Sequence, residues 1–195
     1  MNFTLMLSAT GLAMYLIVFC WYMRLVIRGG ISPNASTWLI WAVLGILNAA
    51  SYQTLSGDWV KAAAAYGACL TNAATFIIAL KLGRFYPLSR RDWLIAIVGL
   101  IAATLWALNP KAPYANGLVL SCIAFSAIPT LVGVWIDPSR ERPIVWNLLA
   151  VSYIFQLIVI GLRWKSGWDL MFPITAMSVN LSVGITSGLR RRFIG

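Results

Sequence analysis

The chain has 195 residues, of which 61% are hydrophobic and 10% are charged, and its formal net charge is +10. A water-soluble domain is about half apolar and about a quarter charged, so this composition excludes that class. The chain has no histidine, and its three cysteines, Cys20, Cys69 and Cys122, lie inside apolar runs without CxxC spacing. We therefore expect no transition-metal site and no cofactor, and we interpret the cysteines as small core residues.

Seven apolar runs approach or exceed the length that crosses a hydrocarbon core about 30 Å thick. They cover approximately residues 5–27, 36–56, 60–82, 92–108, 114–135, 143–162 and 170–189. The bilayer core has no water to bond backbone groups, and the alternating pattern of membrane β-strands is missing, so the runs should be helices. The first run lacks a basic leader and a small-residue cleavage site, which favours a retained helix. The predicted fold class is an all-α integral membrane protein with seven transmembrane helices.

The basic residues lie at the ends of these runs and favour one side of the membrane. With the N-terminus outside, the cytoplasmic segments hold Arg24, Arg28, Lys81, Arg84, Arg90, Arg91, Arg140, Arg142, Arg190, Arg191 and Arg192. The outer segments hold Lys61, Lys111, Arg163 and Lys165. The positive-inside rule therefore places the C-terminus in the cytoplasm, as an odd number of spans requires. This orientation explains the charge without nucleic-acid binding, and we expect a bacterial inner-membrane protein.

An internal repeat divides the chain. Residues 31–41 align with 136–146 at an offset of 105, residues 11–26 with 117–132 at 106, and residues 72–85 with 180–193 at 108. The fourth run has no counterpart, and a lone helix between two units of three lets the second unit insert in the same orientation as the first. We predict a first three-helix bundle at residues 1–86, a linker helix at 87–112 and a second three-helix bundle at 113–195.

A few polar residues stand inside the apolar runs. Asn72 and Asn180 are an identical pair in the repeat, and a buried amide in a membrane either holds helices together or contacts a ligand. The sequence leaves these alternatives open. Two matching helical stripes add Trp41, Asn48 and Tyr52 in the second run and Trp146, Tyr153 and Gln156 in the sixth. The alternative for both tryptophans is the aromatic belt at the membrane surface.

Catalytic and proton-relay chemistry is not evident in the sequence. All five carboxylates, Asp58, Asp92, Asp137, Glu141 and Asp169, lie at span ends or in connections. Proton-coupled pumps usually need a carboxylate or histidine deep in the membrane, so a passive mechanism is favoured. No G-x-S-x-G or H-E-x-x-H motif is present, and an enzyme is not expected.

The 3+1+3 plan resembles the SWEET sugar facilitators, the wider PQ-loop superfamily and the bacterial semiSWEETs. Ser126-Ala127-Ile128-Pro129-Thr130 is similar to the family's Pro-Gln element in the fifth span, with Thr130 where glutamine is usual. Pro143 is similar to the family's proline in the sixth span, whereas Met23 and Trp38 occupy the equivalent first-half positions. The resemblance implies that Pro129, Thr130 and Pro143 form hinges and that Asn72 and Asn180 contact a sugar. The nicotinamide riboside transporters share the same plan.

These observations predict a passive facilitator of a small neutral polar solute, a sugar first of all, that works by alternating access. A vitamin precursor similar to nicotinamide riboside is the second candidate, and a non-transporting membrane receptor or assembly protein is the third. The predicted partners are the solute and the bilayer, and whether the chain forms a homo-oligomer is left open. The expected binding residues are Asn72, Asn180, Asn48, Tyr52, Tyr153 and Gln156. Trp41 and Trp146 are expected to form the gate.

Overall fold

The computed structural model describes residues 3–83, 85, 90–108 and 113–194. These residues form helices, with no strand among them, in the order α1 (Phe3–Ile27), α2 (Ala35–Ser56), α3 (Trp59–Lys81), α4 (Arg90–Leu108), α5 (Pro113–Phe125), α6 (Ile128–Ile136), η1 (Pro138–Arg140), α7 (Pro143–Leu162), η2 (Gly167–Leu170) and α8 (Met171–Ile194). The fold is that of a helical membrane protein, as predicted, and the predicted spans agree with the helices to within a few residues.

Local sequence signals account for several helix ends. The Asn34 side chain caps α2 by accepting from the backbone N–H of Thr37, and the Asp58 side chain caps α3 by accepting from that of Val60. Gly57 ends α2 with φ 63°, a left-handed conformation that glycine adopts without the clash of a Cβ atom. Pro143 is the first residue of α7, where its missing N–H costs nothing.

Six helical segments of the described chain are long and apolar enough to cross a membrane. They are Phe3–Ile27, Ala35–Ser56, Trp59–Lys81, Asn116–Ile136, Pro143–Leu162 and Gly167–Phe193. The predicted linker span corresponds to α4, a helix of 19 residues. Parts of the predicted linker, residues 87–89 and 109–112, lie outside the described residues. A total of seven spans therefore stays a prediction.

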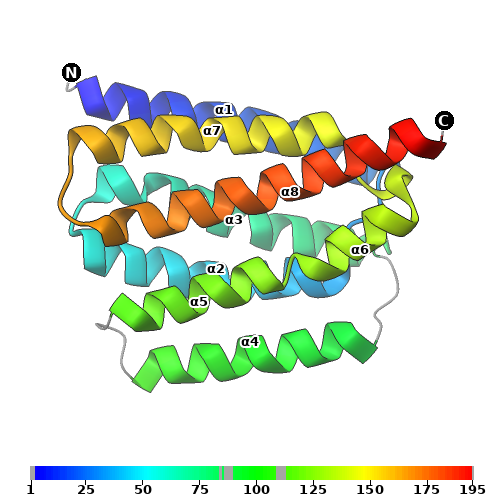
Figure 1. Ribbon diagram of the computed structural model, residues 1–195, viewed down its shortest axis with the longest axis horizontal. Helices are drawn as coiled ribbons and strands as arrows, with labels where there is room; N and C mark the ends of the chain where they lie inside the picture. Colours follow the sequence, from blue (N-terminus) through cyan, green and yellow to red (C-terminus); the bar gives the residue numbers. More distant parts are fainter. Residues whose placement is uncertain (1–2, 84, 86–89, 109–112, 195) are drawn as a thin grey trace.

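The helices form two triples with the same internal order. In the first triple (α1, α2 and α3), α3 packs against both α1 and α2. In the second triple (α5/α6, α7 and α8), α8 packs against both α5/α6 and α7. The triples meet mainly along α1 and α7, while α4 packs on α2 and α5. Figure 1 shows that corresponding helices of the triples run in the same direction and that the chain termini lie at opposite ends of the bundle. We call these the N-side and C-side ends.

The fifth predicted span is broken, as the mid-span proline indicates. Helix α5 ends at Phe125 and α6 begins at Ile128. Pro129 has no N–H to donate, and the N–H of Ala127 turns to Ala124 O at 3.1 Å, so the regular helical ladder is interrupted. The carbonyl groups freed by the break accept from α2. Trp41 Nε1 donates to Ile123 O at 3.0 Å, and Thr37 Oγ1 donates to Ser126 O at 2.7 Å.

The structure corrects one expectation about the interior. Cys122 is buried and Cys69 is half-buried, but Cys20 is exposed on the outside of α1 and is not a core residue. An apolar run in a membrane protein has lipid-facing and protein-facing sides of nearly equal hydrophobicity. Composition alone therefore did not reveal which side of the helix carries Cys20.

Candidate functional site

A cavity lies where the two triples meet. Its volume is about 50 Å³, which is room for roughly three or four water molecules. The predicted residues that line it are Trp41, Asn48, Asn72, Trp146, Tyr153 and Asn180. The first triple contributes half of these side chains and the second triple the other half. Tyr15, Phe19 and Phe172 complete much of the aromatic wall.

The repeat-related asparagines make few contacts with the opposite triple. Asn72 Nδ2 lies 3.5 Å from Trp41 O, a long contact within the first triple. Asn180 Nδ2 donates to Ala176 O at 2.7 Å, one turn back along its own helix. The described residues show no hydrogen bond from either amide across the two triples. Asn72 thus reaches a neighbouring helix of its own triple and Asn180 bonds its own helix, and both side chains lie at the cavity wall.

Asn48 is held differently from the other two cavity amides. Its Oδ1 accepts from Asn116 Nδ2 at 3.3 Å, and the same Nδ2 donates to Ser51 Oγ at 2.6 Å. Asn116 belongs to α5, so this group joins α2 of the first triple to the second triple. All three side chains are buried. Asn48 is thus partly committed to a structural contact beside the cavity.

An aromatic layer closes the cavity toward the C-side end. We use this name for Tyr22, Trp38, Trp41 and Trp146. The Trp146 ring of the second triple lies 5.9 Å from Tyr22, 6.2 Å from Trp38 and 6.0 Å from Trp41 of the first triple, measured between ring centroids. Trp41 and Trp146 are 6% and 1% exposed. They are therefore interior residues and do not form a membrane-surface belt.

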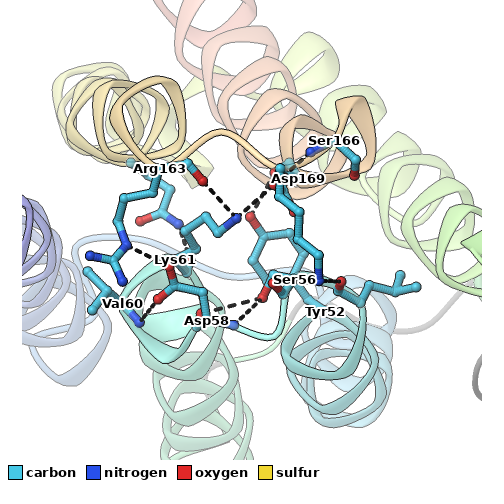
Figure 2. A network of polar contacts seen from close by, with 11 residues as sticks. Tyr52, Ser56, Asp58, Val60, Lys61, Arg163, Ser166 and Asp169 are labelled. Atoms are coloured by element: carbon cyan, nitrogen blue, oxygen red, sulfur yellow. Dashed lines mark hydrogen bonds and ion pairs between the residues drawn. The ribbon is translucent and has the colours of Figure 1, made fainter.

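A polar layer closes the N-side end (Figure 2). We use this name for Tyr52, Asp58, Lys61, Gln156, Arg163 and Asp169. The Lys61 ammonium of α3 forms an ion pair of 2.8 Å with the Asp169 carboxylate of η2, and both side chains are only 2% exposed. Lys61 Nζ also donates to Arg163 O at 3.1 Å. Opposite charges thus meet across the two triples at this end.

The polar layer follows the symmetry of the repeat. Lys61 and Asp169 are separated by the same 108 positions as Asn72 and Asn180, so the ion pair joins equivalent places of the two triples. The Tyr52 hydroxyl of α2 donates to Asp169 O at 2.7 Å, and the Gln156 amide of α7 donates to Lys61 O. Each triple therefore binds the backbone of the other at corresponding points.

A second ion pair lies at the edge of the polar layer. Arg163 Nε is 2.5 Å from Asp58 Oδ2, and Arg163 Nη1 donates to Thr4 Oγ1 at 3.0 Å. Partial burial opposes ionisation of Asp58, but the Arg163 guanidinium, the Val60 amide and the Lys61 ammonium hold its pKa below the ordinary value. Asp58 is thus both the cap of α3 and a contact between the triples.

The structure brings together most, but not all, of the predicted binding residues. Asn72, Asn180, Asn48 and Tyr153 line the cavity, whereas Tyr52 and Gln156 are absent from its wall. Their polar groups are used in the polar layer. The prediction that they bind solute followed from a helical stripe, which gives the side of a helix but not the depth at which a cavity ends.

The remaining predicted residues belong to the hinge region. Thr130 Oγ1 donates to Thr37 Oγ1 at 3.0 Å, so it supports the break between α5 and α6 from the α2 side. Pro129 lies directly after the break and Pro143 begins α7. Neither proline lines the cavity. Their placement agrees with bending positions, and hinge motion itself stays a prediction.

Sequence reasoning missed two features. The sequence places Lys61, Asp169 and Glu141 at span ends or in connections, yet they are 1%, 2% and 1% exposed. For Lys61 and Asp169 a signal was available, since the offset of 108 of the third block, extended toward the N-terminus, aligns these two opposite charges. For Glu141, which contacts Tyr22 and Trp146, no such signal exists in the chain.

Comparison of the chain with family models, with curated proteins and with solved structures found no match.

Proposed function

We propose that the protein is a passive facilitator of a small neutral polar solute, a sugar as the first class, working by alternating access. The observation that carries this is a cavity between the two triples, lined by amide groups from both, with contacts between the triples on either side of it along the bundle. A solute entering it exchanges hydrogen bonds with water for bonds with Asn72 and Asn180, which avoids the cost of burying unpaired polar groups. The aromatic wall supplies surfaces for the apolar faces of a ring.

Alternating access follows from the two closures. Separating Lys61 from Asp169 opens the N-side end, and separating Trp146 from Tyr22 and Trp38 opens the C-side end. In the present structure both sets of contacts are formed, and a cavity of about 50 Å³ is too small for a monosaccharide. Rocking of one triple against the other widens the cavity and opens one end at a time.

The proposal includes the architecture and the orientation. We take the two triples as parallel three-helix bundles and α4 as the linker helix that completes a seven-span 3+1+3 plan. The N-side end faces outward and the C-side end faces the cytoplasm, in accord with the positive-inside rule. A reporter fused to the C-terminus should be active in the cytoplasm. Activity only outside it would contradict the orientation.

Uptake into liposomes tests the function. Purified protein in liposomes should equilibrate at least one member of a panel of radiolabelled sugars, nucleosides and vitamin precursors, with no pH or sodium gradient. Empty liposomes are the control. If no panel member enters faster than into empty liposomes, a non-transporting receptor or assembly protein becomes the better account.

Substitution of the cavity amides tests the site. Asn72→Ala and Asn180→Ala should each reduce uptake about two- to tenfold, because a hydrogen bond to a neutral partner contributes about 0.5–1.5 kcal/mol. Thermal stability should stay close to that of the wild type. Asn147→Ala is the matched control, since Asn147 is an asparagine outside the cavity. Loss of folding in both cavity variants would instead make these amides structural.

A further inference from the structure

Glu141 is a buried acid that the facilitator mechanism does not use. It lies between η1 and α7 and is 1% exposed. Its Oε1 is 3.1 Å from the Tyr22 hydroxyl of the first triple, and its Oε2 accepts from Trp146 Nε1 at 2.9 Å. The carboxyl group therefore bridges two members of the aromatic layer, one from each triple.

Charged groups lie near Glu141, and the hydrogen bonds to its carboxyl oxygens from the described residues come from Tyr22 and Trp146. Among the described residues, the ion pairs are Lys61–Asp169, Arg140–Asp137 and Arg163–Asp58. Arg191 of α8 donates to the backbone carbonyl of Glu141 at 2.9 Å and not to the side chain. Arg140 and Arg142 flank Glu141 in the chain, and the Asp137 carboxylate accepts from Ser139. The hydrogen-bond partners that the described residues supply to the carboxyl group, Tyr22 and Trp146, are thus neutral.

An ionised carboxylate buried in this way costs several kcal/mol, whereas a neutral acid does not. Burial raises the pKa of Glu141 to about 8, although the hydrogen bonds with Trp146 and Tyr22 lower it in part. Trp146 N–H donates to one oxygen of the carboxyl group, and the Tyr22 hydroxyl donates to the other at 3.1 Å. Burial away from water, and not a missing hydrogen bond, therefore disfavours the charged form. Closure of the aromatic layer is therefore matched to a protonated Glu141.

We propose that Glu141 is a proton-binding site that keeps the C-side end closed while protonated and favours its opening when the proton leaves to the solution on that side. The inference rests on the proposed function, in which this end opens and closes. Opening separates Tyr22 from Trp146 and lets water reach the carboxylate. A cavity of about 10 Å³ lies beside it and is lined by Glu141, Arg140, Asn34 and Thr130 among others, which is room for about one water molecule.

The position of Glu141 determines whether its proton can cross the membrane with the solute. The aromatic layer separates it from the cavity, and the polar layer lies beyond the cavity. The proton is therefore taken from and returned to the same side of the membrane. Solute flow is regulated by the pH at the C-side end but is not driven by a proton gradient. This makes the protein a pH-gated facilitator and not a proton symporter.

Infrared spectroscopy of the purified protein in lipid tests the proton site without any transport assay. The wild type should show a protonated carboxylic acid band near pH 7, which disappears at a pH well above the ordinary glutamate value of about 4.3. Glu141→Gln should lack this band, whereas Asp137→Asn, which changes an exposed neighbouring carboxylate, should retain it. A wild type without the band near pH 7 overturns the proposal.

Thiol labelling tests the connection to opening. Cys69 lines the cavity, so a Cys20→Ala, Cys122→Ala background leaves one probe for a water-soluble maleimide. Glu141→Gln mimics the neutral acid and cannot ionise. With a pKa of about 8, linkage predicts that its labelling near pH 9 is about tenfold slower than in the Glu141 protein, with a much smaller difference near pH 7. Comparison at one pH cancels the reactivity of the thiol itself.

The two measurements separate the proposals. Equal labelling with and without the Glu141→Gln substitution at both pH values refutes the link between protonation and opening. If the band and the labelling difference are present while the uptake panel is negative, the proton site stands and the facilitator function fails. If a proton gradient drives accumulation of solute against the solute's own gradient, transport is coupled to protons. That result overturns the proposal that protonation of Glu141 only regulates solute flow.

Discussion

At the N-side end Lys61 and Asp169 meet as opposite charges, whereas at the C-side end Trp146 meets Tyr22 and Trp38 as aromatic rings. The two ends are built by the same repeat, yet the chemistry of closure differs. At the N-side end the equivalent positions hold complementary charges, Lys61 and Asp169, so the two triples attract one another. Identical residues there would have placed like charges together. At the C-side end the equivalent positions, Trp41 and Trp146, are both tryptophan, and two aromatic rings pack well without complementary charge.

The largest expected effect is at the N-side end. Lys61→Met leaves the Asp169 carboxylate buried without its cation, and the loss should be about 3–5 kcal/mol in unfolding free energy. Thermal unfolding in detergent measures it. Lys165→Met, which changes an exposed lysine of the same end, is the control. The double variant Lys61→Met, Asp169→Leu should recover most of the loss, because two apolar residues can replace a buried pair. A single variant as stable as the control would mean that the pair does not hold this end.

The close approach of α7 and α8 toward the C-side end comes next. A Cβ atom added at Gly184 would lie 2.8 Å from Asn147 Cγ and 3.2 Å from Asn147 N. Gly184→Ala should therefore cost about 1–3 kcal/mol, the usual range for overpacking. Gly161→Ala is the matched control, since its Cβ meets no atom within 4 Å. The same thermal assay applies, and equal stability of the two variants would show that this packing is loose.

Removal of one hydrogen bond in the aromatic layer should have a somewhat smaller effect. Trp146→Phe keeps an aromatic ring but removes the N–H that donates to Glu141 at 2.9 Å. Leaving a buried acceptor unsatisfied should cost about 1–2 kcal/mol and speed labelling of Cys69. Trp164→Phe, at an exposed tryptophan, should change neither quantity. If Trp146→Phe changes neither the stability nor the rate of Cys69 labelling, ring packing alone closes the C-side end.

The smallest expected effects are those of pH. Low pH should weaken contacts at the N-side end, and high pH should weaken contacts at the C-side end. The pKa of Asp58 is lowered, so the ionised Asp58 stabilises the fold at pH values above the ordinary pKa of an aspartate. This stabilisation is lost as the pH falls through the lowered pKa. For this partly exposed ion pair we expect a loss of less than about 1 kcal/mol. The pKa of Glu141 is raised to about 8, so its stabilisation is present at low pH and is lost as pH rises through 8. Between about pH 7 and 9 that loss is about 1.4 kcal/mol.

Thermal unfolding across pH separates these contributions. Asp58→Asn should flatten the acid side of the stability curve and leave the alkaline side unchanged, while Glu141→Gln should do the reverse. Ser139→Ala, beside an exposed carboxylate, serves as a control for local changes in η1. If both variants alter the same side of the curve, the two ends do not respond independently.

Much of the fold was predictable from the sequence. Apolar run length, proline position and charge placement led to helices whose ends agree with α1 through α8, and Pro129 predicted the break between α5 and α6. The division into two bundles of three helices, which the repeat predicts, stays a prediction. These signals act locally or through the bilayer, which tolerates only backbones that satisfy their own hydrogen bonds. They do not depend on which helices finally touch.

Depth and burial were decided by the tertiary structure alone. The sequence placed Asn48, Tyr52, Tyr153 and Gln156 on the correct helices, but only the packing of α2 and α7 shows that the cavity includes Asn48 and Tyr153 and ends before Tyr52 and Gln156. Likewise, the sequence placed Glu141 in a connection, where a carboxylate is usually hydrated. Its burial depends on Tyr22, 119 residues away, because a connection becomes interior only when distant helices cover it.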